Sequence, residues 1–339
     1  MSLDRGLQAI NLRLPREIPH TQYISHLGYI DHMTGPKSAH PGESLAKVLD
    51  FDFIWTTASP DTAKPGLWTD MGRAYWHERQ QEQDSRHLAF ASAEEALQVD
   101  VLETYGVWDL ETLKERYRRE ATEALKDHYA VYPGGTYRTQ ISFAIAAFGW
   151  QTLLEMAGLD LKRFTKILDD WLQTLKVHYQ AIAAAPYDCV LTHDDMVWTE
   201  GAFIHPDWYR GELFPRFKEV WDIAHAGGKR VMFCSDGNFQ EFVPDLAAAG
   251  ADGFIFEPLV DLEYMAKEFG QTHVLMGGVD CRVMTFGTES DTRRAVRRAL
   301  DLGRDCPGYF FAVGNHIPDN IPLQNVIACM DEYLKRRAR

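Results

Sequence analysis

Short apolar runs alternate with amphipathic stretches throughout the second half of the chain. Each run holds four or five residues that are nearly all apolar, which is typical of a strand buried on both faces of a parallel sheet. The stretches between the runs carry the period of an amphipathic helix. We predict strands at 189–192, 230–233, 253–256, 273–277 and 309–313, and helices at about 206–226, 238–249, 261–269, 290–304 and 322–336.

Glycine, proline and aspartate mark the borders between these elements. Gly227-Gly228 and Gly250 stand just before the next expected strand, where glycine commonly ends a helix. Pro206-Asp207 and Ser290-Asp291 stand where two helices are expected to begin, as helix-starting and capping residues do. The order strand, loop, helix, glycine therefore recurs and predicts an array of βα units.

The first half of the chain is less regular. Residues 51–56 and 129–132 predict a first and a second strand, and a charged helical stretch at about 75–127 predicts an insertion at the rim of the fold. Two further helices are expected at 137–159 and 160–185.

Seven strands are visible in this pattern, and an eighth is expected near 24–31 or within the insertion. We therefore predict an α/β fold, a (β/α)8 TIM barrel with an N-terminal helical extension, in which residues 1–339 form a single domain. An open doubly wound sheet is the alternative. No glycine-rich dinucleotide or phosphate loop follows any expected strand, which disfavours the nucleotide-binding version of that alternative.

Composition narrows the class of protein. The net charge of −14 argues against general affinity for nucleic acid or anionic membranes, because phosphate surfaces would repel the chain. Five widely spaced cysteines do not resemble a disulfide framework and fit a reducing compartment. No apolar run approaches the roughly 18 residues that a membrane span needs, and the N-terminus lacks the apolar core of a signal peptide. We expect a cytoplasmic protein.

Polar or ionisable residues follow each of the five expected strands in the second half. In a βα barrel the chemistry lies where strands end and their loops begin, so these residues are the candidates for a site. We predict acid–base or catalytic roles for Asp194, Asp195, Asp236 and Asp280. We predict substrate contacts for His193, Trp55, Asn238 and Asn315.

Two chemistries fit such a set. Thiol, carboxylate and imidazole groups could hold a zinc ion through three protein ligands and leave one position open. Crowded carboxylates could instead perform metal-free acid–base work, because crowding raises the pKa of one of them. The donor groups are Cys234, Asp236, Glu257, Asp280, Cys281 and His316. Cys234, Glu257 and His316 also have ordinary structural explanations, as a buried thiol, a solvated carboxylate and a loop histidine.

From about residue 128 to 336 the chain resembles the uroporphyrinogen decarboxylase superfamily, which also contains corrinoid-dependent methyltransferases. The resemblance implies a TIM-type barrel. It rests on the order and spacing of several short signatures, which are 191–195, 204–209 running to Pro215, 233–238, 254–258, 277–280, 286–288, Asn315-His316 and 322–325.

The resemblance is closer to the methyltransferase branch than to the decarboxylases. The decarboxylases carry an arginine-rich N-terminal motif that grips the substrate's carboxylates, whereas Arg73 and Arg138 stand alone here. Thiol-methylating members hold zinc through a His-x-Cys pair and a late cysteine; those positions hold Cys234, Asp236 and approximately Asn315 here. The remaining members imply a metal bound by carboxylate and imidazole.

The resemblance therefore implies Glu257, His316 and Cys234 as metal ligands, with zinc as the metal. It implies transfer of a methyl group from a small donor, such as a methoxylated aromatic compound, to a corrinoid carried by a partner protein. Neither nucleic acid nor a membrane is an expected partner, and the assembly is left open, with a homodimer as one arrangement. The alternatives are a decarboxylase and a non-catalytic ligand-binding barrel.

Overall fold

Six parallel strands form the main sheet, in the order β10-β9-β8-β7-β4-β3. The computed structural model describes residues 2–35, 46–69, 75–76, 82–83 and 89–339. Every pairing in this sheet is parallel, so all six strands end at the same edge. The strands are β3 (Pro133–Thr136), β4 (Cys189–His193), β7 (Val231–Ser235), β8 (Gly253–Phe256), β9 (Val274–Val279) and β10 (Tyr309–Val313).

Two extended segments complete the sheet and close it into a barrel. Residues 19–24 lie beside β10, where the backbone amide of Phe311 donates to Pro19 and that of Thr21 donates to Phe311. Residues 51–54 lie beside the chain leading into β3 and also bond to the first segment, because the amide of Asp52 donates to His20 at 3.0 Å. The ring has eight members, and the predicted barrel is confirmed.

Two of its members differ from the prediction. The eighth is formed by 19–24, and most of the predicted range 24–31 belongs instead to helix α2 (Leu27–Thr34). The second strand was expected at 129–132 but is β3 at 133–136. Its Pro-Gly-Gly-Thr sequence lacks the apolar residues that predict a strand, because neighbouring groups leave no room for them: a Cβ on Gly134 would lie 2.6 Å from Ile182.

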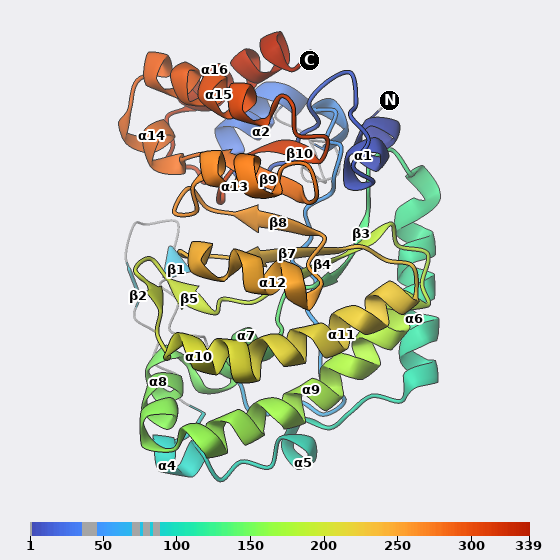
Figure 1. Cartoon of the computed structure of the whole chain (residues 1–339), viewed down its shortest axis with the longest axis vertical. Coiled ribbons are helices and arrows are strands. Elements are labelled where there is room, and N and C mark those ends of the chain that lie inside the picture. The colour runs from blue at the N-terminus through green and yellow to red at the C-terminus, as the bar shows by residue number, and fades with distance from the viewer. Residues whose placement is uncertain (1, 36–45, 70–74, 77–81, 84–88) are drawn as a thin grey trace.

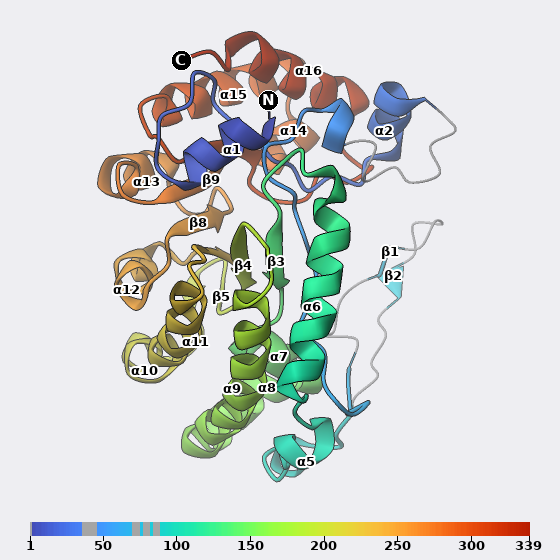
Figure 2. The same cartoon turned by 90° about the vertical axis from the view of Figure 1, so that its right-hand side faces the viewer.

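The helices of the βα units surround the barrel on the outside (Figures 1 and 2). Those of the second half begin and end within a few residues of the prediction, and 206–226 is a continuous run of three helical pieces. The expected helix at 137–159 is broken at Gly149, whose φ is 77°. The elements are α7 (Gln140–Phe148), α8 (Trp150–Leu159), α9 (Leu161–Ala183), α10 (Pro206–Trp208), η2 (Tyr209–Leu213), α11 (Phe214–Ala226), η3 (Gln240–Phe242), α12 (Val243–Ala249), α13 (Leu262–Phe269), α14 (Cys281–Phe286), α15 (Glu289–Gly303) and α16 (Leu323–Arg336).

The expected insertion at 75–127 is helical from residue 93 onward. Its helices are α4 (Ala93–Ala96), α5 (Val101–Tyr105), α6 (Leu110–Ala124) and the short η1 (Leu125–Asp127). The earlier part contains an antiparallel pair, β1 (Tyr75–Trp76) with β2 (Glu82–Gln83), and residues 77–81 and 84–88 lie outside the described part.

A second short pair, β5 (Val197–Trp198) with β6 (Gly201–Ala202), follows β4. No helix in the described ranges has both the length and the apolar character to cross a bilayer.

The core has two layers. The outer layer lies between the strands and the helices. The inner layer fills the barrel, and helix α1 (Ser2–Ile10) adds Ala9 and Ile10 to it. Figure 1 shows α1 at one end of the strands and α14 with the β5–β6 pair at the other. The amino end of the barrel is therefore closed by α1, and the carboxyl end is the open mouth. Other inner-layer residues are Phe53, Val131, Cys189, Leu191, Met232, Cys234, Ile255, Val274, Met276 and Phe310.

An ion-pair network holds α1 against the barrel. The Arg5 guanidinium contacts Asp52 at 2.6 Å, Asp50 at 2.6 Å and Glu17 at 2.7 Å. Asp52 has no exposed surface, and its second carboxylate oxygen accepts from the amide of His20 at 2.8 Å. Arg5 therefore neutralises a carboxylate that has no access to water.

Candidate active site

Three side chains from two neighbouring strands meet at the mouth of the barrel. His193 ends β4 and is paired in register with Cys234 of β7, so the residues that follow them lie side by side. Within the described part of the chain, the one group of three or more His, Cys, Asp or Glu residues whose donor atoms all lie within 4.8 Å of one another is His193, Asp195 and Asp236.

His193 is held rigidly from one side. Its side chain is 2% exposed, and its ring stacks on Tyr137 with centroids 4.0 Å apart and planes inclined by 2°. The Nδ1 atom lies 2.8 Å from the carbonyl oxygen of Tyr137. A carbonyl can only accept, so Nδ1 carries a hydrogen and donates it. This contact fixes the ring orientation and turns Nε2 toward the two carboxylates.

The other ring nitrogen faces negative charge. Nε2 is buried and forms an ion-pair contact with Oδ1 of Asp195 at 3.1 Å. Burial lowers the pKa of His193, but the charges of Asp195 and Asp236 and the Tyr137 carbonyl outweigh it and raise that pKa above its ordinary value. The group therefore favours a positive charge at Nε2.

Backbone contacts position the two carboxylates. The amide of Asp195 donates to Oγ of Ser142 in α7 at 2.9 Å. The amide of Asp236 points to Oδ1 of Asp195 at 3.4 Å. Asp195 is 15% exposed and Asp236 is exposed, so the group lies between the buried wall of the barrel and solvent.

Two adjoining cavities form the mouth. One of about 240 Å³ lies beside the three-residue group, and a smaller one of about 40 Å³ continues across the strand ends. Tyr23 and Tyr137 line both of them. The larger is lined by Tyr23, Thr57, Ser59, Tyr137, Arg138, Ser142, His193 and Asp195, and the smaller adds Trp55, Cys234, Ser235, Asp236, Ile255, Phe256, Glu257, Gly314, Asn315 and His316.

The structure does not gather the expected zinc ligands into one group. Both carboxylate oxygens of Glu257 already accept hydrogen bonds, one from the amide of Gly237 at 2.8 Å and one from the side chain of Asn315. Burial and nearby carboxylates raise the pKa of the Cys234 thiol well above its ordinary value, which disfavours the thiolate that zinc requires. His316 packs against Tyr23, with ring centroids 4.5 Å apart and planes tilted by 32°. The three residues line the mouth but do not fit a zinc–thiolate site.

Three other predicted residues lie away from the mouth cavities. Asp194 is fully buried and accepts from the amides of Ile141 and Ser142 at the start of α7, and burial raises its pKa to about 6. Asp280 caps α14 and pairs with Arg282. Asn238 accepts from the amide of Gln240 and lines a separate depression. These contacts position helices and loops.

Several mouth residues were not predicted. Tyr137 and Arg138 directly follow β3, and Tyr23 lies in the first barrel segment. They were missed because those two members were placed a few residues away from their actual positions. With β3 at 133–136, the strand-end rule would have selected Tyr137 and Arg138.

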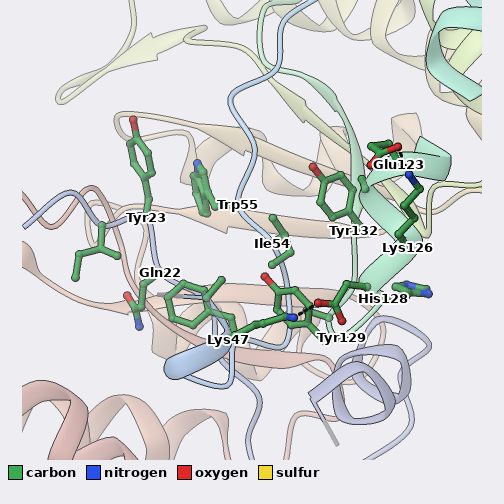
Figure 3. Close-up of a pocket in the computed structure, with 16 residues that line it drawn as sticks. Gln22, Tyr23, Lys47, Ile54, Trp55, Glu123, Lys126, His128, Tyr129 and Tyr132 are labelled. Carbon is green, nitrogen blue, oxygen red and sulfur yellow. Dashed lines mark hydrogen bonds and ion pairs between the residues drawn. The ribbon is translucent and has the colours of Figure 1, made fainter. Parts of the chain in front are cut away.

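A larger cavity of about 730 Å³ is lined by residues 22–24 and 54–55 of the barrel segments that carry Tyr23 and Trp55 (Figure 3). It extends to η1, where Lys47 is paired with Asp127 and lies over the ring of Tyr129. Tyr23 and Trp55 line both this cavity and the mouth, and their rings stack 5.7 Å apart. We place the site at the mouth because charged groups that follow four strands, β3, β4, β7 and β8, converge there.

Comparisons with known proteins agree with this architecture. Residues 107–335 match the family described as uroporphyrinogen decarboxylase (URO-D). Among solved structures, the chain is similar to a methyltransferase from Methanosarcina mazei, with a TM-score of 0.69 and 15% sequence identity over 98% of each chain. No curated protein matches the sequence significantly. The family match spans more than half of the chain, and the chain therefore belongs to the uroporphyrinogen decarboxylase family.

Proposed function

We propose that this protein transfers a methyl group from a small, uncharged donor to a corrinoid carried by a partner protein. One observation supports this choice within the family: the described lining of the mouth is acidic and aromatic. Asp195, Asp236 and Glu257 line it, against Arg138 as the single arginine or lysine. A porphyrinogen with many carboxylates needs several cations to pair with, so this lining favours a neutral donor such as a methoxylated aromatic compound.

The aromatic side chains supply the binding surface for such a donor. Tyr23 stacks on Trp55, and Tyr137 stacks on His193, so flat apolar faces border the cavity next to the charged group. Aromatic rings pack on one another through offset or edge contacts. The donor ring would bind among these residues with its methoxy oxygen directed toward His193.

The charged group has a defined task in this reaction. The carbon–oxygen bond of the donor breaks, its electron pair stays on the oxygen, and the reduced corrinoid supplies the pair for the new bond to the methyl group. The oxygen then takes up one proton. A positive charge at Nε2 of His193, maintained by Asp195 and Asp236, stabilises the oxyanion that develops on the donor.

A partner protein must reach this mouth, and two exposed apolar side chains lie at its rim. Trp198, on the β5–β6 pair that bonds to the 237–238 loop, is 48% exposed. Phe286 ends α14, the helix that directly follows β9, and is 86% exposed. Exposed aromatic residues of this kind commonly anchor a partner.

Incubation with a reduced corrinoid protein and a panel of methoxylated aromatic donors tests the proposal. The expected result is formation of methylcobalamin, seen in the corrinoid absorption spectrum, together with stoichiometric release of the phenol. Release of carbon dioxide from a porphyrinogen, with no methyl transfer from any donor in the panel, would instead identify a decarboxylase.

Replacing Phe286 with serine tests the docking surface. We expect the concentration of corrinoid protein at half-maximal rate to rise about tenfold, because a side chain at an interface hot spot contributes more than about 1 kcal/mol. The maximal rate and the KM for the donor are expected to stay unchanged. Leu159→Ser is the matched control, since Leu159 is 57% exposed at the end of α8. Equal behaviour of the two variants would place the docking surface elsewhere.

A further inference from the structure

We propose that His193, Asp195 and Asp236 bind a divalent metal ion of the zinc or manganese type. The proposal concerns a ligand set different from the Glu257, His316 and Cys234 set that the sequence suggested. The bound ion would supply the positive charge at the proposed active site. The evidence for the ion is the geometry of the three side chains, and it does not depend on the identity of the methyl donor.

The first argument is electrostatic. Nδ1 of His193 already donates to the Tyr137 carbonyl, so a neutral ring presents only a lone pair at Nε2. That lone pair is buried, makes no hydrogen bond and lies 3.1 Å from a carboxylate oxygen of Asp195. Two electron-rich atoms at this distance need a cation between them, which is either a proton on Nε2 or a metal ion that takes the place of that proton. Asp236 adds a second carboxylate within the same 4.8 Å group.

The second argument is preorganisation. Ligating histidines usually donate their other ring nitrogen to a carbonyl or carboxylate, which fixes the ring and the tautomer. The Tyr137 carbonyl has this role here, and the stacked Tyr137 ring restricts His193 further. Ser142 holds the backbone of Asp195. Metal binding would therefore require little rearrangement of β4.

The donor atoms indicate the kind of ion. One imidazole nitrogen and two carboxylates suit zinc, manganese or ferrous iron, and three protein ligands leave coordination positions open. The 240 Å³ cavity is lined by His193 and Asp195, so open positions would face the space that a substrate can enter. A soft thiolate-preferring ion is disfavoured, because the nearby Cys234 thiol holds its proton.

Calorimetric titration of chelator-treated protein with Zn²⁺, Mn²⁺ and Mg²⁺ tests the site without donor or corrinoid. We expect one Zn²⁺ or Mn²⁺ per chain. His193→Ala and Asp236→Asn should weaken binding by about 100-fold or more, since even outer-shell changes cost 10- to 100-fold. Mn²⁺ should also broaden the NMR signals of the His193 ring selectively.

The chain offers a matched control. His205 and Asp207 have the same His-x-Asp spacing and lie 3.6 Å apart, but their side chains are 76% and 83% exposed. His205→Ala should leave metal affinity unchanged. Asp236→Asn is the variant least able to disturb folding, because Asp236 is exposed. Absence of stoichiometric binding to wild-type protein, or equal affinity in wild type, His193→Ala and Asp236→Asn, would overturn the proposal. A protein that binds the ion but transfers no methyl group would contradict only the proposed function.

Discussion

Asp195→Asn is expected to slow methyl transfer by about 10²- to 10³-fold, the usual effect of removing one group that stabilises a developing oxyanion. Asp195 lies 3.1 Å from Nε2 of His193, and its charge is the strongest influence raising the pKa of that ring against burial. Asparagine has nearly the same shape but no charge. The variant should therefore keep the fold and lose the positive charge at Nε2.

Two measurements separate this effect from misfolding. NMR titration of the His193 ring in chelator-treated, metal-free protein should give a lower pKa in Asp195→Asn than in the wild type, and thermal unfolding should change little. The rate should fall in the maximal velocity more than in the KM for the donor, since the group acts on the transition state. Asp207→Asn is the control, because Asp207 is an exposed aspartate that lines neither mouth cavity. A wild-type rate in Asp195→Asn would show that the group has no part in the reaction.

Arg5→Ala is expected to cost about 3–5 kcal/mol of unfolding free energy, the range for breaking a buried ion pair by removing one partner. Asp52 has no exposed surface, and Arg5 is its cationic contact at 2.6 Å. Without Arg5 the carboxylate keeps only the hydrogen bond from the amide of His20. Helix α1 would also lose its attachment to Asp50 and Glu17.

Urea denaturation at two pH values checks this result. Burial raises the pKa of Asp52 from 3.8 to about 7, with Arg5 opposing the rise. A group whose pKa is higher in the folded state stabilises the protein at low pH and loses that contribution as pH rises. Removing Arg5 raises this pKa further, so the deficit of the variant should be smaller at pH 5 than at pH 8.

Two comparison variants complete the test. Arg118→Ala removes an exposed arginine that pairs with Glu115 and should change stability by less than about 1 kcal/mol. Adding Asp52→Asn to Arg5→Ala should recover part of the loss, because a buried amide carries no charge. A deficit that is the same at both pH values and is not relieved by Asp52→Asn would mean that packing of α1, and not charge, holds the amino end.

The regular part of the fold could be predicted because parallel strands buried on both faces read as continuous apolar runs. The irregular members could not. β3 has the sequence Pro-Gly-Gly-Thr, in which close neighbours exclude apolar side chains. Residues 19–24 pair with β10 through isolated contacts, and their sequence, Pro-His-Thr-Gln-Tyr-Ile, contains no continuous apolar run. In both places, tertiary contacts determine the structure more than local sequence does.

The sequence predicts a candidate site at the strand ends, but it does not separate the residues that face the mouth from those that face the helices. Side chains alternate between the two faces of a strand, and Leu191 lies in the inner layer of the core. His193 and Asp195 follow Leu191 by two and four residues, so their side chains lie on the same face as that of Leu191 and face the mouth. Asp194 lies on the opposite face and contacts α7. The same alternation runs from Met232 and Cys234 to Asp236. Applying it to the sequence would have separated Asp194 from Asp195.

The alternation alone could not have identified which strand ends meet. His193 and Asp195 follow β4, and Asp236 follows β7, which is the next strand of the barrel despite the β5–β6 pair and the helices between them. The hydrogen bonds that occupy Glu257 likewise come from other loops, because their donors are Gly237 and Asn315. Such details come from distances between segments far apart in the chain.

Closure of the barrel between its first and last members has a consequence for biosynthesis. The side chain of Gln22 accepts a hydrogen bond from the amide of Val313, 291 residues later in the chain. During translation, the segment at 19–24 leaves the ribosome long before β10 exists. Until then its backbone amides and carbonyls lack the strand that finally covers them, and the ring of Tyr23 lacks its contact with His316. The nascent chain would therefore present an unpaired sheet edge to molecular chaperones until β10 has been synthesised, and the mouth would become competent only at that stage.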